Sequence, residues 1–166
     1  MPDRWLNGYS APVPEDIYEV EIGKAAVRKT GTDLTIVASS YLAVESVKAA
    51  EELGRRGIDA EVIDLRTIKP LDRETIVASV RKTGHLLAVD GGWKSFGVSA
   101  EVAAVAAEQA FDRLKGPVRR LALPDTPAPA SRTLEQAYYK DATHIVDAAC
   151  DMLGRGHIGK EEVVQE

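Results

Sequence analysis

The sequence predicts a single α/β domain in which helices cover both faces of a mostly parallel sheet. Short runs of β-favouring residues alternate with longer amphipathic segments of helical periodicity. Such alternation produces parallel strands joined by right-handed crossovers. The chain has 166 residues, of which 45% are hydrophobic and 28% charged, and this composition fits one domain with a substantial core. We therefore expect a three-layer α/β/α sandwich.

The amino-terminal part of the chain is expected to lead into the sheet. Residues 1–16 are rich in Pro, Gly, Asn and Asp and show no periodicity, which predicts an extended lead-in arm. Residues 18–22 alternate apolar and acidic side chains, and residues 25–28 follow after Gly23, so we expect short strands at an edge position. The continuously β-favouring run at residues 34–38 predicts the first core strand, buried on both faces.

Two strand–helix units are expected next. Residues 42–53 carry apolar side chains mostly three positions apart, and the segment closes at Gly57, which predicts an amphipathic helix. Residues 60–65 form the next predicted strand. Asp72 can cap the amides that follow it, so we expect a helix that begins there and ends before Gly84.

The rest of the chain is predicted to alternate strands and helices in the same way. Strands are expected at residues 85–90 and 117–123, and helices at residues 98–114, 133–139 and 141–153. A proline-rich loop is expected at residues 124–130. The domain proper should therefore span residues 17–153, followed by a flexible tail at residues 154–166.

Composition argues against several classes of function. The formal net charge is −5 and no basic stripe is present, so a nucleic-acid partner is not expected. Cys150 is the only cysteine, which excludes an intrachain disulfide, and its apolar surroundings predict a buried residue. No apolar run resembles a signal peptide or reaches the ~18 residues of a membrane span. We expect no membrane association and a cytoplasmic location.

A ligand of an open parallel sheet binds beyond the carboxyl ends of its strands, so a site is expected in the loops after Ala38, Leu65, Asp90 and Leu123. The first of these loops lacks the glycine-rich pattern of a dinucleotide site and the Gly-X-Ser-X-Gly pattern of a hydrolase. Asp64 and Asp90 end strands, where we expect them to cap loops. The three histidines are scattered, so the sequence predicts no metal site and no catalytic residue.

The loop at residues 91–97, Gly-Gly-Trp-Lys-Ser-Phe-Gly, is the most unusual of the strand-end loops. Its glycine spacing is similar to that of a phosphate loop, but Val98 and Ser99 stand where the Lys-Ser/Thr pair should follow. A glycine-hinged loop that presents Trp93 and Phe96 to another domain or subunit is a better explanation, because such aromatic residues are favoured interface anchors.

Three runs of the sequence, VIDLRTIKPLD, KTGHLLAVDGGW and PDTPAP, are specific enough to indicate a family. Together with their surroundings, over about residues 14–153, they closely resemble the carboxyl-terminal domain of β subunits of thiamine-diphosphate-dependent 2-oxoacid dehydrogenases. These are the decarboxylating components of pyruvate, acetoin and branched-chain dehydrogenase complexes. The resemblance implies a transketolase carboxyl-terminal fold, with a sheet of about five strands of which one is antiparallel.

The resemblance also implies how the chemistry is distributed. In the family, a preceding pyrimidine-binding domain and an α subunit hold thiamine diphosphate and magnesium, so no cofactor is expected on this chain alone. The implied partners are that domain, the α subunit, the lipoyl acyltransferase, and other subunits of a homodimer or hetero-oligomer. The candidate partner-interface residues are Trp93, Phe96, Glu101, Glu108 and Asp125. Their carboxylates would suit a basic docking module.

The expected function is that of an assembly domain in the oxidative decarboxylation of a 2-oxoacid, with acyl transfer to the lipoyl acyltransferase. The domain would contribute subunit contacts and partner docking. Two alternatives stay open. One is a free-standing regulatory module that binds a small molecule in the strand-end crevice. The other is part of a split transketolase acting on sugar phosphates, for which the strand-end loops offer Lys94 and Arg66 as evident cations.

Overall fold

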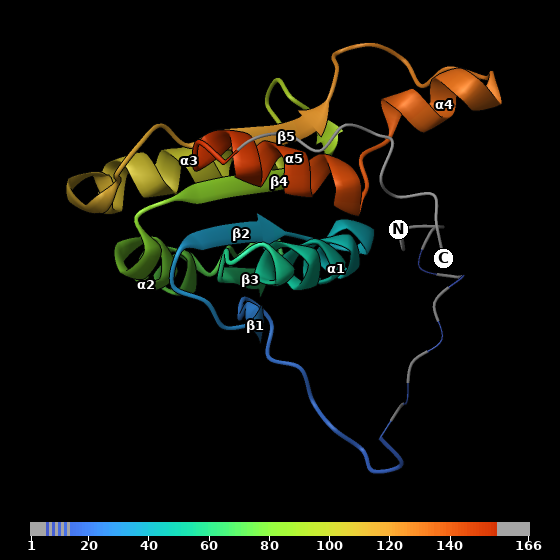
Figure 1. The fold of residues 1–166 in the computed structure, drawn as a ribbon. Helices are drawn as coiled ribbons and strands as arrows, with labels where there is room; N and C mark the ends of the chain where they lie inside the picture. Colours follow the sequence, from blue (N-terminus) through green and yellow to red (C-terminus); the bar gives the residue numbers. More distant parts are fainter. Residues whose placement is uncertain (1–5, 7, 9, 11, 13, 156–166) are drawn as a thin grey trace.

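The computed structural model describes residues 6, 8, 10, 12 and 14–155, and these form a sheet between two layers of helices (Figure 1). The strands are β1 (Ala26–Lys29), β2 (Leu34–Ala38), β3 (Ala60–Asp64), β4 (Leu86–Trp93) and β5 (Arg119–Leu123). The helices are α1 (Tyr41–Arg55), α2 (Arg73–Thr83), α3 (Val98–Gln109), α4 (Arg132–Tyr138) and α5 (Ala142–Met152), with a 3₁₀ turn at Phe111–Arg113. Within the described part of the chain, no helix is long and apolar enough to cross a membrane.

The strand order in the sheet is β1-β3-β2-β4-β5, and only β1 runs antiparallel among the described strands. Helices α1 and α5 pack on one face of the sheet, and α2 and α3 pack on the other (Figure 1). Strands β2 and β3 are buried along their whole length, as expected for central strands covered on both faces. The predicted fold class is confirmed.

One predicted element is wrong, and one helix is shorter than predicted. Residues 18–22 form no strand, and their side chains are exposed. The segment runs away from the sheet (Figure 1), and a strand without a neighbour leaves its backbone groups unpaired. The helix expected to reach residue 114 ends at Gln109, where the guanidinium of Arg81 donates to the backbone carbonyl oxygen at 2.7 Å. The chain then turns, and Leu114 packs beside the core.

Some other predicted elements are present but end at different residues, and some predictions concern residues outside the described part of the chain. Strand β4 continues three residues beyond the predicted end, through the glycine pair to Trp93. Cys150 is buried, as predicted. Residues 156–166 of the predicted tail, and most of the predicted arm at residues 1–16, lie outside the described residues.

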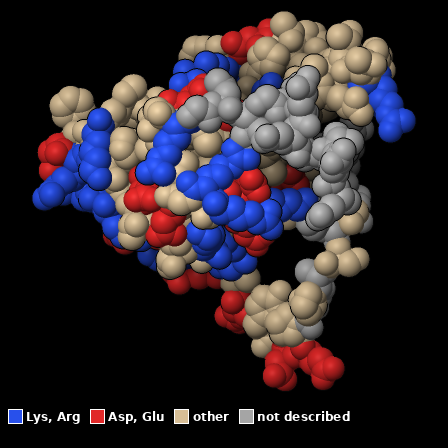
Figure 2. Space-filling model, viewed as in Figure 1, with Lys and Arg blue, Asp and Glu red and all other residues tan. Residues whose placement is uncertain are grey.

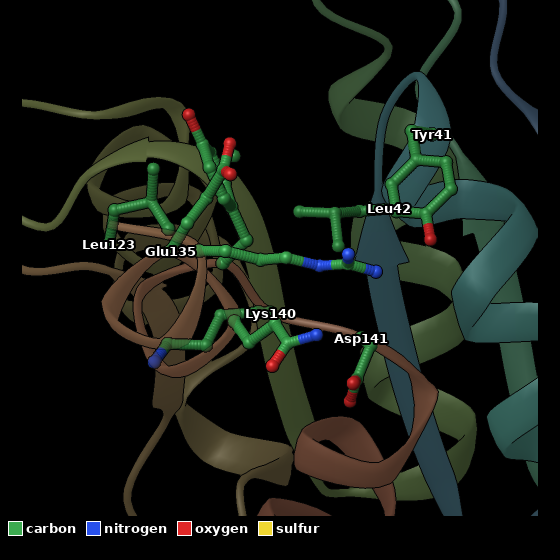
Figure 3. A pocket seen from close by; sticks show the side chains of 10 residues that line it. Tyr41, Leu42, Leu123, Glu135, Lys140 and Asp141 are labelled. Carbon is green, nitrogen blue, oxygen red and sulfur yellow. The ribbon is translucent and has the colours of Figure 1, made fainter. Parts of the chain in front are cut away.

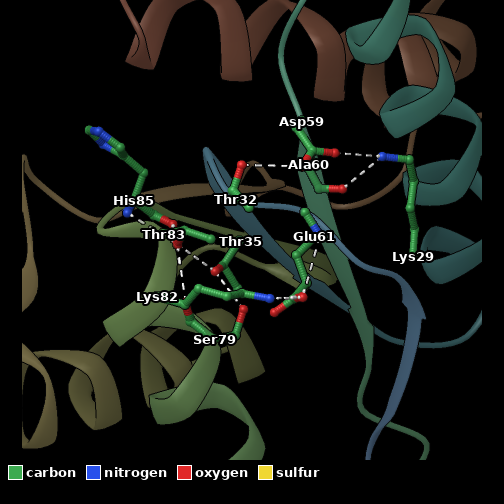
Figure 4. A network of polar contacts seen from close by, with 11 residues as sticks. Lys29, Thr32, Thr35, Asp59, Ala60, Glu61, Ser79, Lys82, Thr83 and His85 are labelled. Atoms are coloured by element: carbon green, nitrogen blue, oxygen red, sulfur yellow. Dashed lines mark hydrogen bonds and ion pairs between the residues drawn. The ribbon is translucent and has the colours of Figure 1, made fainter.

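A polar network fastens the amino ends of the strands (Figure 4). Thr35 on β2 is fully buried, and its hydroxyl bonds to those of Ser79 at 2.7 Å and Thr83 at 2.8 Å, both on α2. Glu61 on β3 is also buried and forms an ion pair with Lys82. Because these buried groups are paired, they hold α2 against the sheet without leaving an unsatisfied charge or hydroxyl. A functional site is therefore to be sought at the carboxyl ends of the strands.

Asp72 joins the start of α2 to the segment before β1. One carboxylate oxygen accepts from the N–H of Thr75 at 3.1 Å, and the other accepts from the N–H of Ala25 at 2.9 Å and the Thr75 hydroxyl at 2.8 Å. Burial by itself raises the pKa of Asp72, but the hydrogen bonds outweigh it and hold this pKa below its ordinary value. The predicted helix cap is confirmed.

Replacing Asp72 by Ala should lower the free energy of unfolding at pH 7 by about 1–2 kcal/mol, because the cap and the bond to Ala25 are lost. The folded-state pKa is depressed, so this stabilisation is present above about pH 4 and is lost as the pH falls through the folded-state pKa. Urea unfolding at pH 7 and pH 3 should therefore show a difference that shrinks in acid. Glu74→Ala, an exposed neighbour, should change stability by less than about 0.5 kcal/mol. A difference that grows toward pH 3 would contradict the assignment.

Candidate functional site

The candidate site lies at the carboxyl edge of the sheet, where the chain changes direction. Strand β2 connects through α1 to β3 on one side, whereas β4 connects through α3 to β5 on the other. The loops that leave the adjacent strands β2 and β4 therefore part at their carboxyl ends, which is the topological switch point of an open α/β sheet. This is one of the places where the sequence predicts a site.

Backbone strain gathers at the same edge. Three residues other than glycine have positive φ angles in the described part of the chain: Ser40 at 56°, Arg66 at 53° and Phe96 at 57°. They follow β2, β3 and β4, which are neighbours in the sheet. Each such residue costs about 1–3 kcal/mol, and strain of this kind clusters at functional sites. The strained backbone at the carboxyl edge therefore lowers the stability of the domain while it sets the shape of the strand-end loops.

Asp90 organises the loop at residues 91–97. Its carboxylate is buried at the end of the covered part of β4. One oxygen accepts from the N–H of Gly92 and the other from the N–H of Ser99 at the start of α3, both at 2.9 Å. The carboxylate thus fixes both ends of the loop, and the predicted capping role is confirmed. Asp64 has a similar role, because it accepts from the N–H of Arg66 at 3.1 Å.

Close packing inside the loop requires Gly97. A Cβ atom at this position would lie 2.3 Å from the carbonyl oxygen of Trp93 and 2.6 Å from Oδ2 of Asp90. The N–H of Lys94 also donates to the carbonyl oxygen of Leu123 on β5 at 2.9 Å. The loop is therefore closed on itself and tied to the neighbouring strand.

The proline-rich loop at residues 124–130 supports the loop at residues 91–97 from outside. Asp125 accepts from the N–H of Ser95 at 3.0 Å and from its hydroxyl at 2.7 Å. These two bonds hold the pKa of Asp125 below its ordinary value. The indole N–H of Trp93 donates to the Tyr138 hydroxyl at 3.3 Å, and that hydroxyl donates to the carbonyl oxygen of Thr126 at 2.7 Å. The loop is therefore shaped before any partner arrives.

The braced loop presents large apolar side chains to solvent. Phe96 is fully exposed, and 57% of the surface of Trp93 is accessible. A rigid loop that exposes two aromatic residues has the properties of an interface anchor, since little conformational entropy remains to be lost on binding. We call residues 91–97 the aromatic loop.

The structure brings together three of the five predicted interface residues. Trp93 and Phe96 belong to the aromatic loop, and Asp125 is bonded to it through Ser95. Glu101 lies in the first turn of α3 and forms an ion pair with Arg73 of α2 at 2.7 Å. Glu108 is exposed near the other end of α3, two helical turns or about 10 Å further along the axis. It does not join the cluster around the aromatic loop.

Charge does not concentrate on one sign over the face shown in Figure 2. Basic and acidic side chains are interspersed over the body of the domain. Several form ion pairs, including Arg28 with Asp64 at 2.7 Å and Arg119 with Asp151 at 3.2 Å. On this face, opposite charges therefore pair locally, and no large region of one charge sign would steer a charged partner.

A cavity lies beside the aromatic loop at the strand ends, where the sequence predicts a site, but the sequence did not reveal which residues line it. It has a volume of about 770 Å³ and opens at the switch point between β2 and β4 (Figure 3). The residues that line it come from five parts of the chain: Tyr41, Leu42, Gly91, Leu123, Arg132, Glu135, Gln136, Tyr139, Lys140 and Asp141. The aromatic pair Tyr138-Tyr139 was the only sequence signal near it that stood out from an ordinary helix end.

Fold and site together define an α/β domain whose distinctive features lie at the carboxyl ends of a parallel sheet. The family model described as "Transketolase, C-terminal domain" matches residues 23–145. The chain belongs to the transketolase C-terminal domain family.

Three similar proteins indicate which members of this family the chain resembles. The pyruvate dehydrogenase E1 component subunit beta of Drosophila melanogaster is 44% identical over 96% of this chain and 45% of its own length. The corresponding subunit of Bacillus subtilis is 43% identical over 89% of this chain and 45% of its own length. A solved structure, "Split gene transketolase, inactive beta4 tetramer", has a TM-score of 0.74 and 31% identity over 86% of this chain and 47% of that one.

These matches confirm the predicted resemblance to 2-oxoacid dehydrogenase β subunits. The chain spans less than half the length of the curated relatives it matches.

Substituting Gly97 by Ala should lower the free energy of unfolding by about 1–3 kcal/mol, because the added methyl group overlaps backbone and carboxylate atoms that cannot withdraw. Gly54→Ala is the matched control. Gly54 lies on the exposed side of α1 with open space around it, so this change should stabilise the protein by up to about 1 kcal/mol. Urea unfolding of both variants checks the pair. Equal effects of the two substitutions would contradict the close packing described for the loop.

Proposed function

We propose that this chain is the carboxyl-terminal assembly domain of the β subunit of a thiamine-diphosphate-dependent 2-oxoacid dehydrogenase. The assembled enzyme would oxidatively decarboxylate a 2-oxoacid and pass the acyl group to a lipoyl acyltransferase. In this role the domain contributes contacts with other chains and supplies no catalytic residue. The observation that carries the proposal is the aromatic loop, which holds Trp93 and Phe96 exposed on a braced backbone.

The residues present do not fit the magnesium ion that accompanies the cofactor. Within the described residues, no three or more His, Cys, Asp or Glu side chains lie together as metal ligands. The two strand-end carboxylates already have partners, since Asp64 pairs with Arg28 at 2.7 Å and Asp90 accepts from two backbone N–H groups. The proposal therefore assigns thiamine diphosphate and magnesium to other domains or chains of the enzyme.

Docking through the aromatic loop has a clear energetic basis. Full burial of a Phe side chain contributes about 1.5–3 kcal/mol, and burial of Trp93 would add to it. The backbone of Phe96 is already in the left-handed region, so the strain belongs to the unbound domain and adds nothing to the cost of binding. We assign this surface to the α subunit and the pyrimidine-binding domain.

Acidic residues beside the aromatic loop and along α3 suit a second kind of contact. Asp125 is a carboxylate at neutral pH, as an ordinary aspartate is, and Glu101 and Glu108 lie on the exposed side of α3. Such carboxylates would attract a basic docking module of the lipoyl acyltransferase, with an effect on association rate that weakens in salt. This contact is independent of the aromatic anchors.

Phe96→Ser should weaken assembly with the α subunit and the pyrimidine-binding domain from the same organism by about tenfold or more, because an anchor side chain is removed. Sedimentation velocity across a concentration series measures the effect. Phe111→Ser is the matched control, since Phe111 is also exposed but lies in the 3₁₀ turn after α3. Assembly that is equally strong with Phe96→Ser would overturn the proposal, as would equal weakening by both substitutions.

A further inference from the structure

We propose that the cavity at the switch point is a binding site for a small aromatic anion, meaning a flat ring that carries a phosphate or a carboxylate group. This inference goes beyond the assembly role and does not depend on it. The cavity measures about 770 Å³, within the range of roughly 300–1,000 Å³ that is typical of small-molecule sites. It also lies at the place in an open α/β sheet where ligands bind.

The walls come from both sides of the switch point (Figure 3). Tyr41 and Leu42 begin α1, which leaves the sheet on one side, whereas Gly91 and Leu123 belong to β4 and β5 on the other. Gly91 has no side chain, so the strand backbone is accessible to a ligand there. The segment from α4 to the start of α5 closes the remaining side.

The apolar part of the lining suits a flat ring. Tyr41 and Tyr139 line the cavity together with the aliphatic side chains of Leu42 and Leu123. The ring of Tyr139 packs edge-on against Tyr138, with centroids 5.2 Å apart and an interplanar angle of 88°. Tyr138 is itself held by its hydroxyl bond to the proline-rich loop. A ring wall that is already fixed favours stacking with an aromatic ligand.

The polar part of the lining suits an anion. Arg132 has no hydrogen-bond or ion-pair partner among the residues that the structure describes, so its guanidinium group is available for a bidentate contact with a phosphate or carboxylate. Lys140 adds a second positive charge. Asp141 is engaged elsewhere, because its carboxylate accepts from the N–H of His144 at 3.2 Å and contacts the Nδ1 atom of that ring at 2.7 Å. The lining also contains the carboxylate of Glu135, so the preference for an anion rests on Arg132, the charged lining side chain that has no partner in the described part of the chain.

Helix α1 reinforces this preference. Its first residues line the cavity, its first turn carries no acidic side chain, and its dipole therefore adds positive potential at the opening. The loop before it lacks the glycine-rich pattern of a dinucleotide site. The anionic group is accordingly assigned to the Arg132 side chain on α4 and not to a backbone cradle.

The test uses the full chain at low salt and isothermal titration calorimetry with four probes. Adenosine monophosphate combines a ring with a phosphate, and indole-3-acetate combines a ring with a carboxylate. Inorganic phosphate and adenosine are the separate parts. We expect saturable binding of at least one ring-bearing anion, and at least tenfold weaker binding of the separate parts. Tighter binding of adenosine monophosphate would identify a phosphate site, and tighter binding of indole-3-acetate would identify a carboxylate site. Binding of neither ring-bearing anion would overturn the proposal.

Arg132→Gln should weaken binding of the ring-bearing anion by about ten- to a hundredfold, because a charged hydrogen bond is lost. Arg113→Gln is the matched control, since Arg113 is an exposed arginine in the 3₁₀ turn away from the cavity, and it should bind as the wild type does. Tyr139→Leu should weaken binding of ring-bearing probes, with thermal unfolding used to show that each variant is folded. Unchanged affinity of Arg132→Gln would also overturn the proposal, without affecting the assembly experiment with Phe96→Ser.

Discussion

The bridge made by the Asp90 carboxylate sets the shape of the carboxyl edge. It bonds to the N–H of Gly92 on one side of the aromatic loop and to the N–H of Ser99 on the other. A buried carboxylate is costly unless its oxygens are satisfied, so the chain around it must keep both donors in place. Gly97 follows from this constraint, because only a residue without a Cβ atom fits between Asp90 and Trp93. The exposure of Phe96 depends on the same bridge.

The two ends of the sheet have different physical roles. At the amino ends, Thr35 and Glu61 are buried and paired with α2, so that end is closed and stable. At the carboxyl ends, strained backbone, exposed aromatic residues and a cavity lie together. Sites of recognition commonly give up stability in this way, and a closed opposite end makes that loss tolerable. Tyr138 links the aromatic loop to the cavity. Its hydroxyl accepts a hydrogen bond from Trp93, and its ring packs against Tyr139.

Local sequence signals were enough to predict most of the fold. The buried runs of β2 and β3, the Asp72 cap and the left-handed Gly84 at the end of α2 each depend on a few neighbouring residues. The strand predicted at residues 18–22 failed because a strand needs a partner that no local pattern supplies. The aromatic loop was recognised from its composition, and its docking role stays a prediction. The sequence predicted a crevice at the strand ends, but the lining of the cavity could not be predicted, because residues as distant as Tyr41 and Asp141 meet there only in three dimensions.

The aromatic loop is shaped before any partner binds, and residue-resolved amide hydrogen exchange of the chain alone tests this most directly. The amides of Gly92, Lys94, Ser95 and Ser99 each donate a hydrogen bond within or beside the loop. They should be protected to a degree comparable with the amides of β4, because opening them requires the bonds to Asp90, to Asp125 or to the carbonyl oxygen of Leu123 to break. Exchange of these four amides at the rate of an unstructured chain, with β4 protected, would contradict the claim.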